Sequence, residues 1–107
     1  MRKMKEKVFV SKLDDLIPRI GREVHYNDKT IALFRLSNDE IKAVNNKCPH
    51  KEGPLAEGTV SGNFVFCPLH DYKISLEDGK VQEPDDGCVE TYQTVVEDGD
   101  VYLVLEQ

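Results

Sequence analysis

Four side chains that can bind a soft metal lie in two short groups near the middle of the chain. Cys48 and His50 form the first group, and Cys67 and His70 form the second. Each group offers one thiolate and one imidazole, donors that suit zinc or iron–sulfur centres far better than calcium or magnesium. Because each pair can converge on a metal from one tight turn, the sequence predicts a metal centre held between two loops.

The mixed pairing within each group bears on which metal centre is present. Zinc fingers usually pair two Cys in one group and two His in the other. A [2Fe–2S] centre with two Cys on one iron and two His on the other needs one residue of each type from both loops. We therefore favour the iron–sulfur centre. A Cys₂His₂ zinc site is the main alternative, and four separate structural residues are the remaining one.

Length and charge restrict the classes of protein to which the chain can belong. With 107 residues, of which 39% are hydrophobic, we expect one domain over 1–107, its cluster-binding part at about 45–85. The net charge of −6 disfavours binding to nucleic acid or to an anionic membrane surface. The apolar stretch after the basic start is too short for a signal-peptide core, and no stretch is long enough to span a membrane. We expect a cytoplasmic protein.

The cysteines do not indicate a disulfide framework. The chain has three of them, an odd number, and the third, Cys88, is too distant to join either group. We expect Cys88 to be a small buried hydrophobic residue.

Short strands separated by turn signals predict an all-β fold, a small antiparallel sandwich or barrel with a cluster-binding subdomain of two hairpin loops. Turns are expected at 27–28, 78–79 and 98–99, and Ser11 is expected to cap a single helical turn. The stretch 30–36 is apolar at both alternating sets of positions, so it should be covered on both faces. The predicted strands are 7–10, 22–26, 30–36, 40–44, 64–66, 72–76, 80–82, 89–96 and 101–105.

The two groups resemble the signature of the Rieske family, which is Cys-x-His, an intervening segment of about this length, and Cys-x-x-His. The resemblance extends over roughly 41–105 through short motifs such as Gly53-Pro54-Leu55, Asp78-Gly79 and Pro84-Asp85. It implies that Cys48 and Cys67 bind the buried iron of one [2Fe–2S] cluster per chain. It also implies that His50 and His70 bind the outer iron, and that Pro84 lies in a loop that covers the cluster.

Within this family, the amino-acid sequence of segments 67–74 and 84–89 is most similar to that of the small subunits of assimilatory NAD(P)H nitrite reductases. That similarity implies an electron-transfer subunit, without catalytic residues of its own, whose partner is a large subunit that carries flavin and siroheme and reduces nitrite to ammonia. The alternative is a free ferredoxin that receives electrons from a ferredoxin reductase and passes them to an oxygenase. A zinc-stabilised binding module is a third possibility.

The respiratory branch of the family differs from this chain at two informative positions. It carries an extra Cys in each loop, and these join in a disulfide, whereas here loop one has no second Cys and Leu69 fills the place in loop two. Its Ser that donates to a bridging sulfide is replaced by Tyr72. Fewer hydrogen bonds to the sulfurs stabilise the reduced cluster less.

We therefore expect a midpoint potential toward the low end of the roughly −150 to +300 mV range of Rieske centres. A redox titration followed by visible absorption measures it. A midpoint clearly above about +100 mV would contradict the reasoning from Leu69 and Tyr72.

Overall fold

The computed structural model describes residues 5–26, 29–47, 54–68, 72–83 and 87–106. Within these ranges the secondary structure is β-strand with two short 3₁₀ helices, η1 (Leu13–Asp15) and η2 (Leu55–Glu57). The predicted all-β class is therefore confirmed. Among the described residues, no helix has the length and apolar character needed to cross a membrane.

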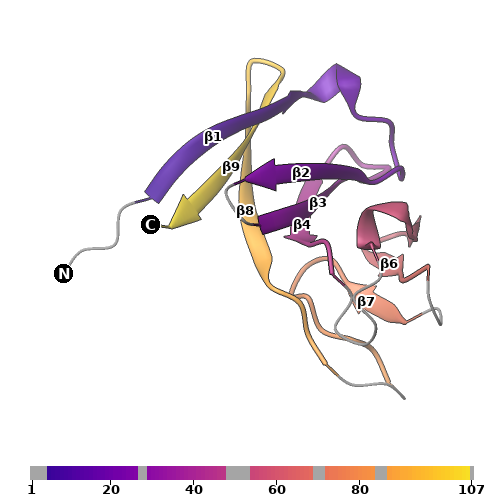
Figure 1. Cartoon of the computed structure of the whole chain (residues 1–107). Coiled ribbons are helices and arrows are strands. Elements are labelled where there is room, and N and C mark those ends of the chain that lie inside the picture. Colours follow the sequence, from indigo (N-terminus) through magenta and orange to yellow (C-terminus); the bar gives the residue numbers. More distant parts are fainter. Residues whose placement is uncertain (1–4, 27–28, 48–53, 69–71, 84–86, 107) are drawn as a thin grey trace.

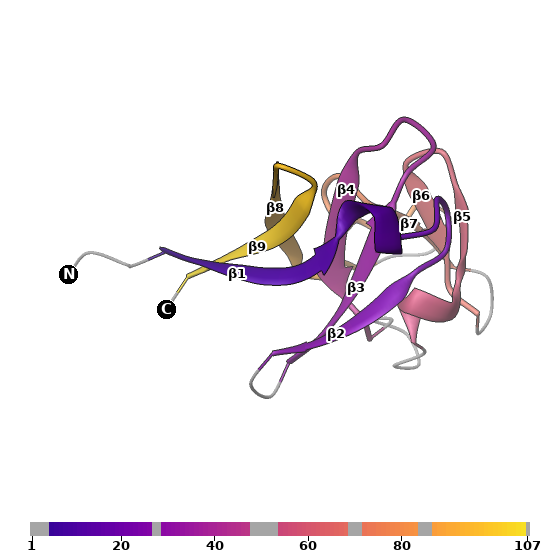
Figure 2. The same cartoon turned by 90° about the horizontal axis from the view of Figure 1, so that it is seen from above.

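The strands form two antiparallel sheets, which are seen from two directions in Figures 1 and 2. The larger sheet has the spatial order β1 (Lys5–Lys12), β9 (Asp100–Glu106), β8 (Thr91–Glu97), β4 (Ile41–Asn45), β3 (Lys29–Arg35) and β2 (Arg22–Tyr26). The smaller sheet has the order β5 (Thr59–Ser61), β6 (Phe64–Phe66) and β7 (Lys73–Ser75).

The larger sheet curves until its two edge strands, β1 and β2, approach each other as a nearly closed barrel. Side chains join these edges: Arg22 Nη1 donates to Ser11 Oγ at 3.4 Å, and the Tyr26 hydroxyl donates to Glu6 Oε2 at 3.1 Å. Closing a sheet in this way covers strand edges that would otherwise be open to pairing with other chains. The first strand, predicted over 7–10, thus lies at one edge of the larger sheet.

Strand β3 is buried on both faces, as the sequence predicted. Ile31 and Leu33 point into the barrel, while Ala32 and Phe34 pack against the smaller sheet, and all four side chains are fully buried. One strand thus belongs to both hydrophobic cores. This fixes the smaller sheet, which carries the second predicted loop, against the barrel.

The turn chemistry follows the sequence at both Asp-Gly sites. Asp98 and Gly99 have φ angles of 50° and 79°, and they connect β8 to β9. Positive φ at both central residues is the geometry of a tight hairpin turn whose twist matches that of the strands. At the second site Gly79 has φ 74°, and the Lys80 N–H donates to Asp78 Oδ1 at 3.0 Å.

Two local predictions differ from the structure. Ser11 lies within β1 and does not cap η1; its hydroxyl donates to the carbonyl of Lys12, the residue at the cap position. The stretch 80–82 is not a strand and makes only isolated bridges, in which Val81 pairs with Ile74 and Lys80 with Cys88. Strand β1 includes Ser11 because it pairs there with Val101 of β9, a distant partner that local propensity does not reveal.

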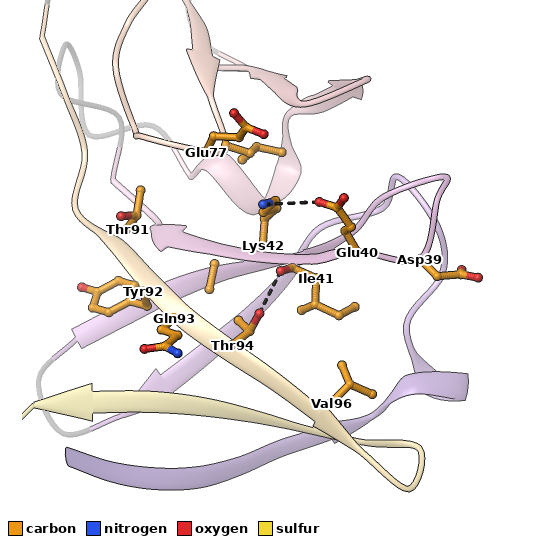
Figure 3. A pocket seen from close by; sticks show the side chains of 12 residues that line it. Asp39, Glu40, Ile41, Lys42, Glu77, Thr91, Tyr92, Gln93, Thr94 and Val96 are labelled. Carbon is orange, nitrogen blue, oxygen red and sulfur yellow. Dashed lines mark hydrogen bonds and ion pairs between the residues drawn. The ribbon is translucent and has the colours of Figure 1, made fainter.

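Strands β4 and β8 pair only at Ala43 with Tyr92 and at Val44 with Thr91, and then diverge. Beyond that point the hydroxyl of Thr94 donates to the carbonyl of Ile41 at 2.8 Å, which is drawn in Figure 3. The hydroxyl of Tyr92 is buried without a hydrogen-bond partner among the described residues. Burial, and to a smaller extent the nearby Glu90 carboxylate, raises the pKa of Tyr92 to about 12.

Tyr92 should make stability depend on pH in the alkaline range. Because its pKa of about 12 in the folded chain exceeds the ordinary value of 10.0, the folded state holds the phenolic proton more tightly than the unfolded state. The resulting stabilisation is complete below pH 10 and is lost as pH rises toward 12. The free energy of unfolding in urea should therefore fall more steeply across this range for the native chain than for Tyr92→Phe.

At neutral pH, Tyr92→Phe should be as stable as the native chain or more stable, because it removes a buried hydroxyl that lacks a partner. Parallel stability curves for the two proteins above pH 10 would contradict this account of Tyr92.

Candidate metal centre

The first predicted loop begins and ends at positions held by several hydrogen bonds. Lys47 and Pro54 form an antiparallel bridge that closes it. One residue outward, the Leu55 N–H donates to the Asn46 carbonyl at 2.7 Å, and the Ala56 N–H donates to Asn46 Oδ1 at 2.8 Å. Cys48 and His50 fall between the bridged residues, outside the part of the chain that the structure describes. This loop lies between β4 and η2 in the chain.

The second predicted loop is the tip of the β6–β7 hairpin, as expected. Phe66 pairs with Lys73, and the Cys67 N–H donates to the Tyr72 carbonyl at 2.9 Å. Cys67 is 1% exposed and packs in the hydrophobic core that the smaller sheet shares with β3. His70 lies between Cys67 and Tyr72, outside the described residues.

The ends of the two loops touch at Gly58, the residue that follows η2. A Cβ atom at this position would lie 2.3 Å from the carbonyl oxygen of Phe66, far inside van der Waals contact. Only glycine permits so close an approach. Because Phe66 directly precedes Cys67, the return of loop one lies beside the start of loop two.

A third loop begins beside the second. The Gln82 N–H donates to the Lys73 carbonyl at 2.8 Å, and the Val81 N–H donates to the Gly87 carbonyl at 3.0 Å. Pro84, expected to cover the cluster, falls within this loop but outside the described residues. The elements that flank the three loops include η2, β6 and β7, which lie close together at the lower right of Figure 1.

The surroundings of Cys67 suit a metal-bound thiolate. Its side chain lies among Leu55, Val65 and other apolar residues, where an unpaired charged thiolate would be costly. Coordination by iron removes that cost, and the apolar shell shields the centre from water on this side. The part of the chain that the structure describes contains no group of three or more His, Cys, Asp and Glu residues that could hold a metal; of the four predicted ligands, it includes Cys67 alone.

Two residues outside the predicted ligand set can now be placed. Cys88 is exposed, so the expectation of a buried residue is wrong. Its backbone forms an isolated antiparallel bridge with Lys80. His25 lies on β2 with 71% of its side chain exposed, and its Nε2 is 3.4 Å from Glu23 Oε1. It is a surface histidine.

A hollow of about 550 Å³ opens where β4 and β8 diverge. Figure 3 shows Lys42, Glu40, Glu77 and Thr94 around it. Cys67, the one predicted ligand that the structure describes, is not among the residues that line it. The hollow is therefore distinct from the described part of the candidate metal centre.

Sequence comparison decides which family this architecture represents. Residues 7–104 match the family described as the Rieske-like [2Fe-2S] domain. The chain belongs to this family. It is thus a Rieske-type electron-transfer domain. The match confirms the resemblance found in the sequence and extends far beyond the two Cys/His groups.

Relatives that the chain matches along nearly their whole length include ferredoxins of dioxygenases and small subunits of nitrite reductases. The chain is 33% identical over 102 residues to a 3-phenylpropionate/cinnamic acid dioxygenase ferredoxin subunit of Photorhabdus laumondii, with 94% of this chain and 95% of the relative covered. It is 30% identical over 100 residues to the nitrite reductase (NADH) small subunit of Escherichia coli K12, with coverages of 88% and 93%. The solved ferredoxin of carbazole 1,9a-dioxygenase from Nocardioides aromaticivorans superposes with a TM-score of 0.84 at 25% identity, covering 91% of this chain and 95% of that one.

Replacement of a predicted thiolate ligand should abolish the cluster. Cys48→Ser and Cys67→Ser should each lose iron and acid-labile sulfide, because thiolate is the ligand that holds iron. His70→Ala should lose the outer iron or make the cluster labile. Iron and sulfide analysis of freshly purified protein measures all three effects.

His25→Ala is the matched control, since this histidine is exposed on the barrel, and it should retain the native content of iron and sulfide. An undiminished iron and sulfide content in Cys48→Ser or Cys67→Ser would refute the ligand assignment.

Proposed function

We propose that this Rieske-type chain is the electron-transfer small subunit of an NAD(P)H-dependent nitrite reductase. The match to the Escherichia coli small subunit along nearly the whole of both chains supports this role. The motif at 67–74, together with Pro84-Asp85, favours it over the ferredoxin role. The two identities, 30% and 33%, are too similar to rank the roles by themselves.

In this proposal Cys48 and Cys67 bind one iron, and His50 and His70 bind the other. The bound cluster supplies one-electron transfer, and imidazole ligands give it a higher potential than four thiolates would. The residues of this chain hold the ligands and keep water from the cysteine side, where Cys67 is almost fully buried. The histidine side would then face the redox partner.

The partner proposed is a large subunit that carries siroheme and flavin and reduces nitrite to ammonia. Electrons that originate from NAD(P)H would pass through the small chain, which we place in the cytoplasm as one domain over 1–107. This route assigns electron transfer to the small chain and the chemistry of nitrite to its partner.

A free ferredoxin that donates to an oxygenase is the second candidate. It is favoured by the 33% identity to a dioxygenase ferredoxin subunit and by the superposition on the carbazole dioxygenase ferredoxin. In that role the chain would receive electrons from a ferredoxin reductase and would bind the oxygenase only transiently.

Co-purification from the native cell separates the two roles. We expect the affinity-tagged chain to retain a large protein with siroheme absorption, and the pair to oxidise NAD(P)H when nitrite is added. The Cys67→Ser chain should retain the large protein if it folds, but the pair should lose nitrite-dependent turnover. The His25→Ala chain should behave like the native protein.

The proposed role would be overturned if the chain with a full cluster retained no siroheme protein and instead supported substrate oxidation by an oxygenase in the presence of a ferredoxin reductase. Zinc in place of iron, with no visible absorption, would contradict both electron-transfer roles.

A further inference from the structure

Asn46 is one of two buried polar or charged residues among those the structure describes, and it is 6% exposed. Burying an amide is unfavourable unless its polar atoms are paired. Its position directly after β4 and two residues before Cys48 places it at the start of loop one.

Three hydrogen bonds connect Asn46 to both sides of the loop. Its N–H donates to the Thr30 carbonyl at 2.9 Å, which extends the pairing of β4 with β3. Its carbonyl accepts from the Leu55 N–H at 2.7 Å, and its side-chain Oδ1 accepts from the Ala56 N–H at 2.8 Å.

These bonds satisfy two of the backbone N–H groups at the start of η2, where intrahelical partners are missing. The side chain of the cap residue, Pro54, makes no hydrogen bond to these N–H groups. Asn46 therefore acts as a remote cap, because the donor groups that a local Ser or Asp would satisfy are satisfied from the opposite end of the loop.

We propose that Asn46 is a positioning residue for the cluster: its side chain fixes the separation of the two ends of loop one and so holds Cys48 and His50 in their binding geometry. This inference rests on the proposed ligand set. It assigns to Asn46 no contact with the cluster itself. Outer residues that orient metal ligands typically change metal affinity by about 10–100-fold when they are replaced.

The test replaces Asn46 with Leu, which has a similar volume and no acceptor, and with Asp, which keeps an acceptor oxygen. Cluster lifetime is measured by the decay of visible absorption in the presence of an iron chelator. We expect Asn46→Leu to lose its cluster at least about tenfold faster than the native chain. Asn46→Asp should restore most of the lifetime.

The matched control is Thr94→Val. It also removes one 2.8 Å hydrogen bond between a side chain and the backbone, but this bond is donated by the Thr94 hydroxyl to the Ile41 carbonyl and joins β8 to β4 in the barrel (Figure 3). Thermal unfolding of each variant shows how much general destabilisation accompanies the change. The control should keep the native cluster lifetime even where its melting temperature falls.

The electron spin resonance spectrum of the reduced protein provides a second readout. Asn46→Leu should shift or broaden the signal of the remaining cluster, since the ligands of loop one are no longer fixed, whereas Thr94→Val should leave it unchanged. If Asn46→Leu does not fold, Asn46→Ser, whose hydroxyl is too short to reach the Ala56 N–H, replaces it in both measurements.

Native-like cluster lifetime and spectrum in Asn46→Leu or Asn46→Ser would overturn this proposal, as would losses equal to those of Thr94→Val. Failure of the ligand assignment would look different, because the native chain itself would then lack iron or would retain it in Cys67→Ser.

Discussion

The burial of β3 on both faces is the constraint on which the rest of the structure depends. A strand whose four central residues, 31–34, are all apolar cannot face water on either side, so a second layer must cover the side that the barrel leaves open. The smaller sheet provides that layer: Phe34 and Ala32 of β3 share a core with Val65 and Cys67. A predicted ligand is thus packed into the same hydrophobic core that joins the two sheets.

The loops take their positions from this junction. Neighbouring β4 ends at Asn45, Asn46 continues its pairing to Thr30, and the chain then enters loop one. Loop two leaves from β6, whose Val65 is fully buried in the shared core. Both loops leave from strands fixed by one core, and the chain that returns from loop one lies beside the start of loop two at Gly58.

Much of this arrangement could be predicted from the sequence where the signal is local. Apolar residues at both alternating sets of positions in 30–36 indicated two covered faces, and Asp98-Gly99 indicated a tight turn. Each of these signals depends only on adjacent residues. Pairing between distant segments could not be predicted in the same way. The pairings of β1 with β9 and of β4 with β8 bring together strands far apart in the chain, and no local pattern encodes them. Cys88 was expected to be buried because free cysteine usually is, and its exposure depends on the fold around it.

In the candidate site, too, some features have a local signal in the sequence and others depend on contacts across the fold. Residue type and spacing indicated the four ligands, because metal chemistry requires Cys and His, whereas the role of Asn46 depends on a contact with Ala56 across the loop. An asparagine between a strand and a ligand group was the only local signal for it. Pulsed electron spin resonance of the reduced native protein tests the central claim most directly. The account predicts two strongly coupled histidine nitrogens at a [2Fe–2S] cluster, and a cluster signal without histidine nitrogens, or no cluster at all, would contradict it.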